Sequence, residues 1–339
     1  MIIDSIISEF RPQIEKTLVE EFERWLPKSC DELRQILAYH MGWQGEITGE
    51  AAQGKRIRPL ITLLCCSAAG GNWQTALPAA AAVEFVHNFS LLHDDIQDRS
   101  QTRRGRLTAW VKWGDAMAIN AGDALYTIAI LSLTGIKHQV SSEAALTGTQ
   151  ILLQACAQLT QGQHLDLAYE KIEDLPTSAY WTMIEGKTAA LLSAAAELGA
   201  LVANEKDENT RQQFHRFGYK LGMAFQVVDD WLGVWGDPKL TGKSAGSDLI
   251  SRKKTIPILY GLQKKGQFYN RFIHSMISEE ETAILKQYLI EEGAQTYTQE
   301  LAEKLTAEAL QSLEDAVVIR NEHYQVLKEL SLLLTNRRN

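Results

Sequence analysis

Hydrophobic residues recur every three or four positions along most of the chain, which is the spacing of one face of an α-helix. The first such stretch covers residues 2–26 and stops at Pro27, and Asp31 is suited to cap a second helix. Strand-like alternation bounded by hairpin turns is absent, so we predict an all-α fold. Further helices are expected at 59–69, 77–98, 108–134, 142–160, 178–202, 208–234, 255–264, 280–290, 297–314 and 317–334.

The length of the chain raises the question of how many domains it forms. Single cores usually stop growing near roughly 250–300 residues, and this chain has 339. It contains no Pro/Gly/Ser-rich linker and no abrupt change of composition, so we predict one large helical domain over residues 1–339. The apolar stretch 188–203 is interrupted by Glu197 and is shorter than the roughly 20 residues that a membrane-spanning helix needs. We interpret it as a buried helix and expect no membrane span.

Composition and charge narrow the classes of partner. Hydrophobic residues make up 45% of the chain and charged residues 22%, as in soluble globular proteins, and the formal net charge of −8 argues against nucleic acid or an anionic membrane as the general partner. The four cysteines show no metal-ligand spacing, which favours a reducing compartment. The N-terminus lacks a basic start followed by an apolar run, so no signal peptide is expected. We therefore predict a cytoplasmic protein.

The densest candidate chemistry is an acidic group at the end of the expected helix 77–98. The four-residue spacing places Asp94 and Asp98 on one face, a turn apart, with Asp95 alongside. Carboxylates this close repel one another unless a cation lies between them, and all-oxygen ligands suit Mg²⁺. The alternative is a solvated helix end whose acids pair with nearby arginines. A second acidic pair at 229–230, in another apolar helical segment, favours the metal site.

Two basic groups are suited to bind an anion. Lys55, Arg56 and Arg58 follow a glycine and end at a proline, so an anion at the helix N-terminus formed there would meet three cations and free N–H groups. An exposed basic loop is the alternative interpretation. Just after the first acidic group, Arg103 and Arg104 can hold phosphate oxygens in bidentate fashion.

Two further segments carry polar groups within apolar helices. Gly186 lies beside Lys187 and Thr188, so a kink that directs these side chains into a cavity is one interpretation, and an exposed lysine is the other. Gln226 falls on the same helical face as the first residue of the second acidic pair. The loop at 236–248 is rich in Gly, Ser and Lys, which is typical of a lid closed by an anion and also of an ordinary flexible connection.

These segments, in this order, resemble the trans-isoprenyl diphosphate synthase family of polyprenyl synthetases, and they are closest to its geranylgeranyl diphosphate synthases. Eight motifs match in sequence order, which is far more agreement than either acidic motif gives alone. They are GKRIRP at 54–59, HNFSLLHDDIQD at 87–98, RRGR at 103–106, GDAL at 122–125, GQHLDL at 162–167, EGKTAAL at 185–191, FQVVDDWLG at 225–233 and GDPKLTGKSAGSDL at 236–249.

The resemblance implies a helical bundle around a deep central cavity, a homodimer, and head-to-tail condensation of an allylic diphosphate with isopentenyl diphosphate. Heterolysis of the allylic C–O bond concentrates negative charge on the departing diphosphate, which metal ions and fixed cations stabilise. The metal ligands implied for three Mg²⁺ ions are Asp94 and Asp98 on one wall and Asp229 on the other, with Asp95 and Asp230 in support.

Further roles are implied for basic and polar residues. Those implied to grip the allylic diphosphate are Arg103, Lys187, Lys243 and Lys253. Those implied to bind isopentenyl diphosphate are Lys55, Arg58, His87 and Arg104. Oxygen dipoles for the allylic cation are implied at Thr188 and Gln226.

The match to the family departs from its pattern at three positions. Gly233 stands where the strict second DDxxD motif has a third aspartate, Gln53 where a first glycine is usual, and Leu107 where RRGxP has proline. None of these departures removes a residue assigned to metal or diphosphate, so we expect activity to be retained.

Product length is implied by the residues about one helical turn before the first acidic group. Ser90 lies four residues before Asp94, about 5.4 Å along a helix, and Phe89 precedes it. In the family, side chains at this depth form the floor of the prenyl cavity. One aromatic beside a small serine resembles enzymes that make the twenty-carbon product, geranylgeranyl diphosphate, and farnesyl or longer products stay open.

Two other classes of protein stay open. A class I terpene cyclase shares the metal chemistry but needs no second diphosphate site, so Lys55, Arg58 and Arg104 count against it. A non-catalytic regulatory subunit of a heteromeric synthase is the second alternative. Such subunits can lose one acidic motif, whereas this chain has both. We therefore predict an Mg²⁺-dependent prenyltransferase.

Overall fold

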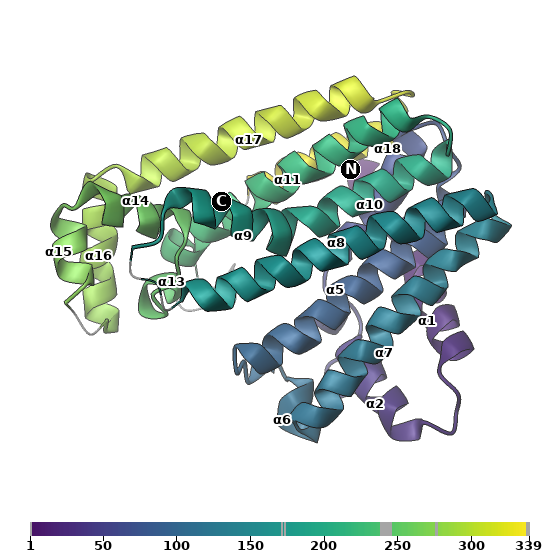
Figure 1. The fold of residues 1–339 in the computed structure, drawn as a ribbon, viewed down its shortest axis with the longest axis horizontal. Coiled ribbons are helices and arrows are strands. Elements are labelled where there is room, and N and C mark those ends of the chain that lie inside the picture. The colour runs from purple at the N-terminus through teal and green to yellow at the C-terminus, as the bar shows by residue number, and fades with distance from the viewer. Residues whose placement is uncertain (1, 171, 173, 238–245, 275–276, 337–339) are drawn as a thin grey trace. The chain divides into compact units, whose positions relative to one another are not determined.

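The computed structural model describes residues 2–170, 172, 174–237, 246–274 and 277–336. In these residues nearly all regular structure is helical, which confirms the all-α prediction (Figure 1). The α-helices are α1 (Ile2–Trp25), α2 (Asp31–His40), α3 (Glu50–Gln53), α4 (Ile57–Ala68), α5 (Leu77–Gln97), α6 (Ala109–Trp113), α7 (Asp115–Leu133), α8 (Ser142–Tyr169), α9 (Thr177–Ile184), α10 (Ala190–Ala203), α11 (Glu208–Trp235), α13 (Ser247–Ile250), α14 (Ile256–Lys264), α15 (Gln267–Phe272), α16 (Glu279–Glu291), α17 (Ala294–Ala316) and α18 (Glu322–Thr335). Tighter 3₁₀ turns lie at Trp73–Ala76 and Thr134–His138, a π-helical turn lies at Glu185–Ala189, and β1 (Thr102–Arg103) pairs antiparallel with β2 (Arg106–Leu107).

Most predicted helices are present, and the differences have local causes. The segment expected at 108–134 is divided at Gly114, whose φ of 84° ends α6. The α8 helix runs on past 160 to Tyr169, because Gly162 serves a close backbone contact inside the helix and does not end it. The short hairpin β1–β2 was not expected. Asp31 is the first residue of α2 and makes no cap, so that prediction was wrong; its carboxylate accepts from Gln35 Nε2 instead.

The chain folds into two compact units. Unit 1 comprises residues 1–154, 194–214 and 317–327, and unit 2 comprises 155–193, 215–316 and 328–339, each as far as the structure describes it. The divisions in α8, α10, α11 and α18 fall within helices, and the one between 316 and 317 falls at the end of α17. The single domain over 1–339 and the deep central cavity stay predictions.

In unit 1, α5 and α7 lie side by side along their lengths (Figure 1). Small side chains are present on both helices: the run 79–82 on α5 is four buried alanines, and Gly122 lies on α7. A Cβ added to Gly122 would lie 2.3 Å from Nε2 of His93, so any side chain there would displace the His93 ring. A proline in the first turn starts α5, and the last turn carries the acidic group.

The core of unit 2 is built from α9, the π-helical turn, the later part of α11, α14 and α17. Buried side chains that form it include Tyr180, Met223, Val227, Ile256 and Ala302. A second cluster joins the end of α11 to α13, α14, α15 and α16, with Phe268 and Phe272 stacked at 4.9 Å between ring centroids.

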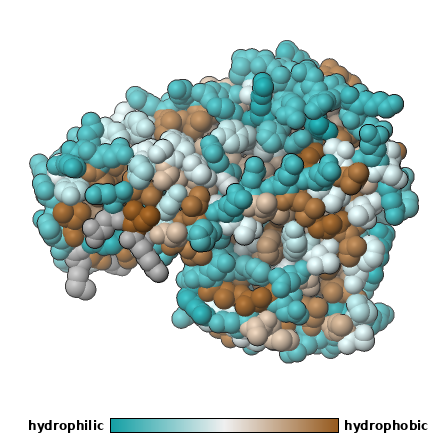
Figure 2. Space-filling model, viewed as in Figure 1, coloured by the Kyte–Doolittle hydropathy of each residue, from teal (hydrophilic) through white to brown (hydrophobic). Residues whose placement is uncertain are grey.

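Two helical stretches among the described residues are long and apolar enough to cross a membrane. They are Asp115–His138 and Thr177–Ala203, and 44% and 89% of their apolar windows are buried in the fold. Core helices of soluble proteins pass the same test, so this is weak evidence for a span. On the face in Figure 2, hydrophilic residues cover much of the surface and hydrophobic residues lie in scattered groups between them.

Candidate active site

The acidic group of unit 1 lies at the end of α5 and faces the β1–β2 hairpin. Asp95 is buried, the Asp94 side chain is 23% exposed, and Asp98 is exposed. Arg103 reaches back from β1, with Nη2 at 2.7 Å from Oδ1 of Asp95 and 3.4 Å from Oδ2 of Asp94. The turn between the strands allows this, since Arg104 and Gly105 both adopt positive φ, of 53° and 72°, as tight hairpin turns require.

The carboxylate of Asp95 is only partly satisfied. Its Oδ1 accepts from Arg103, whereas its Oδ2 is buried without a hydrogen-bond partner among the described residues. Burial raises the pKa of Asp95, and the hydrogen bond and charge of Arg103 act against that shift. A second cation close to this oxygen would satisfy it.

The donor set of this acidic group fits a hard divalent cation. Asp94 and Asp98 offer carboxylate oxygens a turn apart on α5, and Asp95 adds the unsatisfied oxygen beside them. In the described part of the chain, no group of three or more acidic, histidine or cysteine side chains is close enough to hold a metal ion by itself. Mg²⁺ commonly takes one or two protein carboxylates and completes its shell with water and phosphate oxygens.

A second, basic group in unit 1 joins α4 to α5. Nη1 of Arg58 lies 3.3 Å from Nε2 of His87. Arg104 extends to the end of α3, where its Nη1 donates to the carbonyl oxygens of Ala52 and Gln53. Gly54 makes room for it, because a Cβ there would lie 2.7 Å from Arg104 Nη2.

The electrostatics of this basic group favour an anion. Burial lowers the pKa of His87 well below its usual value, and the nearby guanidinium groups of Arg58 and Arg104 lower it further. Burial and neighbouring arginines also lower the pKa of Arg104 to about 10, although Glu84 acts in the opposite direction. Arg104 stays charged at neutral pH, and His87 is neutral. An anion would relieve the mutual repulsion of these cations.

The structure separates the three cations that the sequence grouped before α4. Arg56 is buried, with Nε at 2.6 Å from Glu15 Oε1 and Nη1 at 2.7 Å from Glu84 Oε1, so it stabilises the core and is not available to a ligand. Lys55 is exposed, whereas Arg58 faces His87. The prediction of a three-cation anion site is corrected to Lys55 and Arg58.

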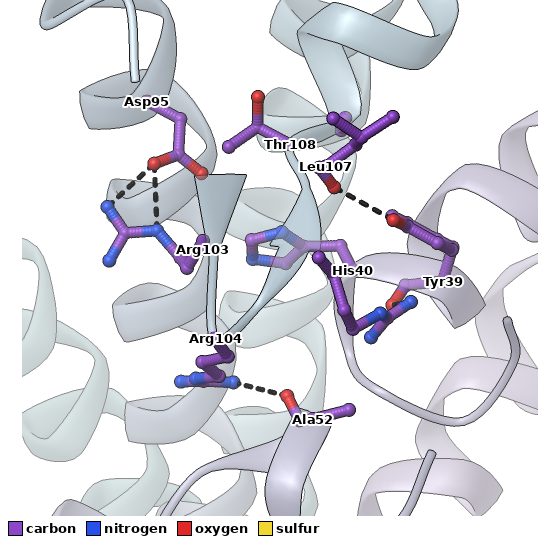
Figure 3. Close-up of a pocket in the computed structure, with 10 residues that line it drawn as sticks. Tyr39, His40, Ala52, Asp95, Arg103, Arg104, Leu107 and Thr108 are labelled. Carbon is purple, nitrogen blue, oxygen red and sulfur yellow. Dashed lines mark hydrogen bonds and ion pairs between the residues drawn. The ribbon is translucent and has the colours of Figure 1, made fainter. Parts of the chain in front are cut away.

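A pocket lies under the hairpin, between α2 and the end of α5 (Figure 3). The imidazole of His40, from the last turn of α2, points toward the hairpin that carries Arg103 and Arg104. Burial, followed by the charges of Arg104 and Arg103, lowers the pKa of His40 to about 3, despite a hydrogen bond to the backbone of Asn88. His40 is therefore neutral among arginines.

Unit 2 joins four of its polar side chains in one chain of hydrogen bonds. The hydroxyl of Thr188 donates to Oε1 of Gln226 at 2.6 Å, and Nε2 of Gln226 donates to Oδ1 of Asp230 at 2.9 Å. Tyr180 Oη donates to Oδ2 of Asp230 at 2.6 Å, and the same oxygen accepts from the backbone N–H of Ile256 at 3.0 Å. Asp230 is thus buried and satisfied on both oxygens.

The π-helical turn positions Lys187 beside Thr188. Gly162 of α8 and Gly186 of the turn touch through their backbones, because a Cβ on Gly162 would lie 2.1 Å from the amide nitrogen of Lys187. Extra-residue turns of this kind are frequent at functional sites. Lys187 Nζ pairs with Oδ2 of Asp166 and its side chain is 24% exposed, so the exposed-lysine interpretation was wrong. The kink stays a prediction, and the π-helical turn is the kind of irregularity that causes one.

The second acidic pair has different surroundings on its two residues. Asp229 is half-buried, in contrast to Asp230, since adjacent helical positions point about 100° apart. A Cβ on Gly233 would lie 2.0 Å from Oδ2 of Asp248, so the Asp248 carboxylate occupies the space where the strict motif would project its third aspartate. Lys253, five residues after Asp248 in the sequence, is half-buried. Lys243 and much of the expected lid lie outside the described residues.

The two residues assigned to product length lie on α5. The Phe89 ring packs against Tyr126 of α7 and against His93, at 5.2 Å and 5.0 Å between centroids. Ser90 is half-buried, and its Oγ donates to the carbonyl oxygen of His87.

Several residues of these groups had no assigned role in the sequence interpretation. His40 and Tyr180 carry no local pattern, because their neighbours in the fold are distant in sequence. Asp166 and Asp248 lie inside matched motifs, so those motifs were the available signal.

Comparison with known proteins identifies the family. Residues 47–292 match the polyprenyl synthetase family. A (2E,6E)-farnesyl diphosphate synthase of Mycobacterium tuberculosis is 40% identical over 254 residues, 73% of this chain and 68% of that relative. A geranylgeranyl diphosphate synthase of the same organism is 41% identical over 248 residues, 71% of this chain and 70% of that relative.

Solved structures agree over nearly the whole chain. A polyprenyl synthetase from Streptomyces coelicolor is 33% identical with a TM-score of 0.87, covering 98% of this chain and 99% of that one. A polyprenyl synthase from Caulobacter crescentus, complexed with calcium and isoprenyl diphosphate, is 29% identical with a TM-score of 0.82, covering 99% and 98%. The chain belongs to the polyprenyl synthetase family and is a trans-prenyltransferase.

Proposed function

We propose that this protein is an Mg²⁺-dependent synthase that condenses isopentenyl diphosphate head-to-tail with an allylic diphosphate and releases geranylgeranyl diphosphate. The observation that carries the proposal is that unit 1 holds two separate charged groups. One is the acidic end of α5 with Arg103, and the other is the basic group of Arg58, His87 and Arg104. A reaction between two diphosphates needs both, whereas a terpene cyclase needs one.

We assign the basic group to isopentenyl diphosphate. Arg58 and Arg104 supply guanidinium forks for phosphate oxygens, and Lys55 adds an exposed charge. His87 is neutral, so its nitrogen lone pair accepts from Arg58 and holds that guanidinium in place.

From the family resemblance, we assign both acidic motifs to the allylic diphosphate. Asp94, Asp98 and Asp229 would hold Mg²⁺, with Asp95 in support. The bound metal would neutralise the negative charge on the leaving diphosphate. Arg103 and Lys187, which pair with Asp95 and Asp166 in the described structure, would turn part of their hydrogen bonding to phosphate oxygens. Lys243 and Lys253 are assigned to the same diphosphate from the family resemblance.

The reaction then needs little covalent chemistry from the protein. The allylic C–O bond breaks, the double bond of isopentenyl diphosphate attacks the allylic carbon, and a proton leaves to the released diphosphate. Thr188 and Gln226 offer oxygen dipoles to the cationic carbon, and no protein base is required. The calcium and isoprenyl diphosphate in the Caulobacter crescentus structure support this chemistry for a relative.

Product length is the finer part of the proposal. Farnesyl and geranylgeranyl diphosphate synthases are equally similar to this chain, so overall similarity does not choose between them. Phe89 supports the twenty-carbon product, because its ring is backed by Tyr126 and gives the α5–α7 wall an aromatic barrier beside the small Ser90. We further propose that the protein is a homodimer, which sedimentation of the purified protein tests, and that it is cytoplasmic, which fractionation of cells tests.

The deciding experiment incubates the purified chain with isopentenyl diphosphate, Mg²⁺ and, separately, dimethylallyl, geranyl or farnesyl diphosphate. Products are identified by mass spectrometry after dephosphorylation, and parallel reactions contain EDTA. A linear twenty-carbon alcohol that disappears with EDTA is the expected result. Another linear length would overturn only the Phe89 argument. A cyclised hydrocarbon from one substrate, or no product at all, would overturn the synthase proposal.

A further inference from the structure

Asp230 is the meeting point of three elements in unit 2. Tyr180 comes from α9, Gln226 and Asp230 from α11, and the N–H of Ile256 from the start of α14. Tyr180 is 0% exposed and Asp230 2% exposed. The sequence assigned Asp230 to metal binding, but both of its oxygens already accept hydrogen bonds from buried donors. Removing a charged acceptor from such a site leaves those donors unpaired.

The contact with Asp230 fixes the orientation of the Gln226 amide. Nε2 of the amide donates to Oδ1 of Asp230, so the carbonyl oxygen faces away from the carboxyl group. The hydroxyl of Thr188 then donates to that carbonyl oxygen. Consequently the Thr188 oxygen keeps its lone pairs, and the carbonyl oxygen of Gln226, not an N–H of the amide, lies beside it.

We propose that Asp230 and Tyr180 are positioning residues that hold the carbonyl oxygen of Gln226 and the hydroxyl oxygen of Thr188 toward the allylic cation, and that Asp230 is not a metal ligand. This inference rests on the proposed function. Tyr180 acts through Asp230, which it keeps in place from the opposite side with a phenol hydroxyl. Asp229, the half-buried neighbour on α11, is left as the metal ligand of the pair.

The inverted amide would be harmful for an electrostatic reason. With Gln226 flipped, an N–H dipole would point its positive end at a developing cation, so the group would destabilise the transition state that it now stabilises. A misplacement of a catalytic group by about 1 Å can cost on the order of 100-fold in rate. Substrate binding, by contrast, depends on the diphosphate groups and should change little.

The test compares Tyr180→Phe, Asp230→Asn and Gln226→Ala in the full-length protein. We expect kcat to fall about 10-fold in Tyr180→Phe and about 100-fold in Asp230→Asn, with KM for both substrates within about twofold of wild type. In the Gln226→Ala background, Tyr180→Phe should have no further effect on kcat, because the group it positions is gone. Additive effects would overturn the proposal.

The matched control is Tyr219→Phe. Tyr219 also donates its hydroxyl to a carboxylate at 2.6 Å, in this case Oε1 of Glu185 on the π-helical turn, but it takes no part in the Asp230 contacts. We expect its kcat to stay near wild type. Equal losses of kcat in Tyr219→Phe and Tyr180→Phe would mean that both changes act through general destabilisation, which would overturn the proposal. Thermal unfolding of each variant is measured alongside the kinetics.

A binding measurement separates this inference from the proposed function. Calorimetry with Mg²⁺ and inorganic pyrophosphate, without prenyl substrate, should give the same affinity for Asp230→Asn and wild type, and an affinity about 10-fold weaker for Asp229→Asn. A comparable loss in Asp230→Asn would restore it as a metal ligand and overturn the inference alone. If the wild-type chain neither binds Mg²⁺-pyrophosphate nor elongates a substrate, the proposed function fails and this inference fails with it.

Discussion

Nη1 of Arg58 lies 3.3 Å from Nε2 of His87, and the direction of this hydrogen bond follows from chemistry. Arginine has no acceptor, so His87 accepts through Nε2 and carries its proton on Nδ1. Burial and the neighbouring arginines lower the pKa of His87 well below its usual value, which keeps that lone pair free of a proton. The neutral imidazole of His87 therefore orients the guanidinium of Arg58. It does not offer a positive charge of its own to an anion.

Replacement of His87 tests this relationship. His87→Ala should raise KM for isopentenyl diphosphate by about 10-fold, because Arg58 loses its acceptor, while KM for the allylic substrate stays near wild type. His87→Gln supplies an amide oxygen as acceptor and should recover part of the loss. His138 is exposed at the end of the 3₁₀ turn after α7, and His138→Ala is the control. Equal increases in both KM values would contradict the assignment to one diphosphate.

The buried, neutral His40 makes stability depend on pH. The pKa of His40 is about 3 in the folded chain, whereas an unperturbed histidine, as in the unfolded chain, has a pKa of 6.5. Between these two values the unfolded chain binds a proton that the folded chain does not. The free energy of unfolding therefore decreases as the pH falls below 6.5. Between pH 7.5 and 5.5 this residue alone accounts for about 1 kcal/mol.

Denaturant unfolding of wild type and His40→Gln at these two pH values measures the contribution of His40. The variant should lose less stability on acidification, since glutamine does not titrate. An identical pH dependence in the two proteins would show that His40 binds a proton equally well in the folded and unfolded states, which contradicts a lowered pKa. His138→Gln is again the control, as an exposed side chain of the same type.

The outcome at particular residues indicates what the sequence was able to predict. Helical spacing was sufficient to put Asp94 and Asp98 on one face of α5, because that relationship is local. It did not predict that Arg56 would be buried, since its partners Glu15 and Glu84 lie 41 and 28 residues away in the chain. Local patterns describe faces of helices, and long-range contacts decide which of those faces is covered.

The second acidic pair, Asp229 and Asp230, also shows that long-range contacts decide which residues of a helix are buried. Two adjacent aspartates look equivalent in the sequence, but α11 turns one toward the core, where Tyr180, 50 residues earlier in the chain, donates to it. Gly186 suggested a kink from the sequence, but the backbone contact that it makes with Gly162 of α8 was not predicted. Such contacts need the tertiary structure to be recognised.

Phe89 and Tyr126 give the prediction about product length. Phe89→Ala should lengthen the product beyond twenty carbons, because removal of the ring opens space along α5 beside Tyr126. Tyr126→Ala should lengthen it less, since it removes the support of Phe89 and leaves the ring itself. Chain lengths are compared by mass spectrometry with those from Leu146→Ala, which truncates a 62% exposed side chain of α8. Unchanged products in Phe89→Ala would remove Phe89 from the cavity floor.

The close approach of Gly233 and Asp248 explains how the chain manages without the third aspartate of the strict motif. A side chain at 233 would begin 2.0 Å from Oδ2 of Asp248, so the two positions compete for one space, and Asp248 fills it with a carboxylate. Gly233→Asp alone should lower the free energy of unfolding by about 1–3 kcal/mol through overpacking and like-charge repulsion. Asp248→Asn should raise the Mg²⁺ concentration for half-maximal activity by about 10-fold.

The decisive protein is the exchange variant, Gly233→Asp with Asp248→Gly. If the carboxylate matters more than the position that supplies it, this variant should be more stable than Gly233→Asp and need less Mg²⁺ than Asp248→Asn. Thermal unfolding and Mg²⁺ titrations of activity measure the two effects. Asp315→Ala, at an exposed position on α17, is the control for loss of an acid in unit 2. An exchange variant no better than either single variant would mean that Asp248 has a role of its own on α13, independent of the space beside Gly233.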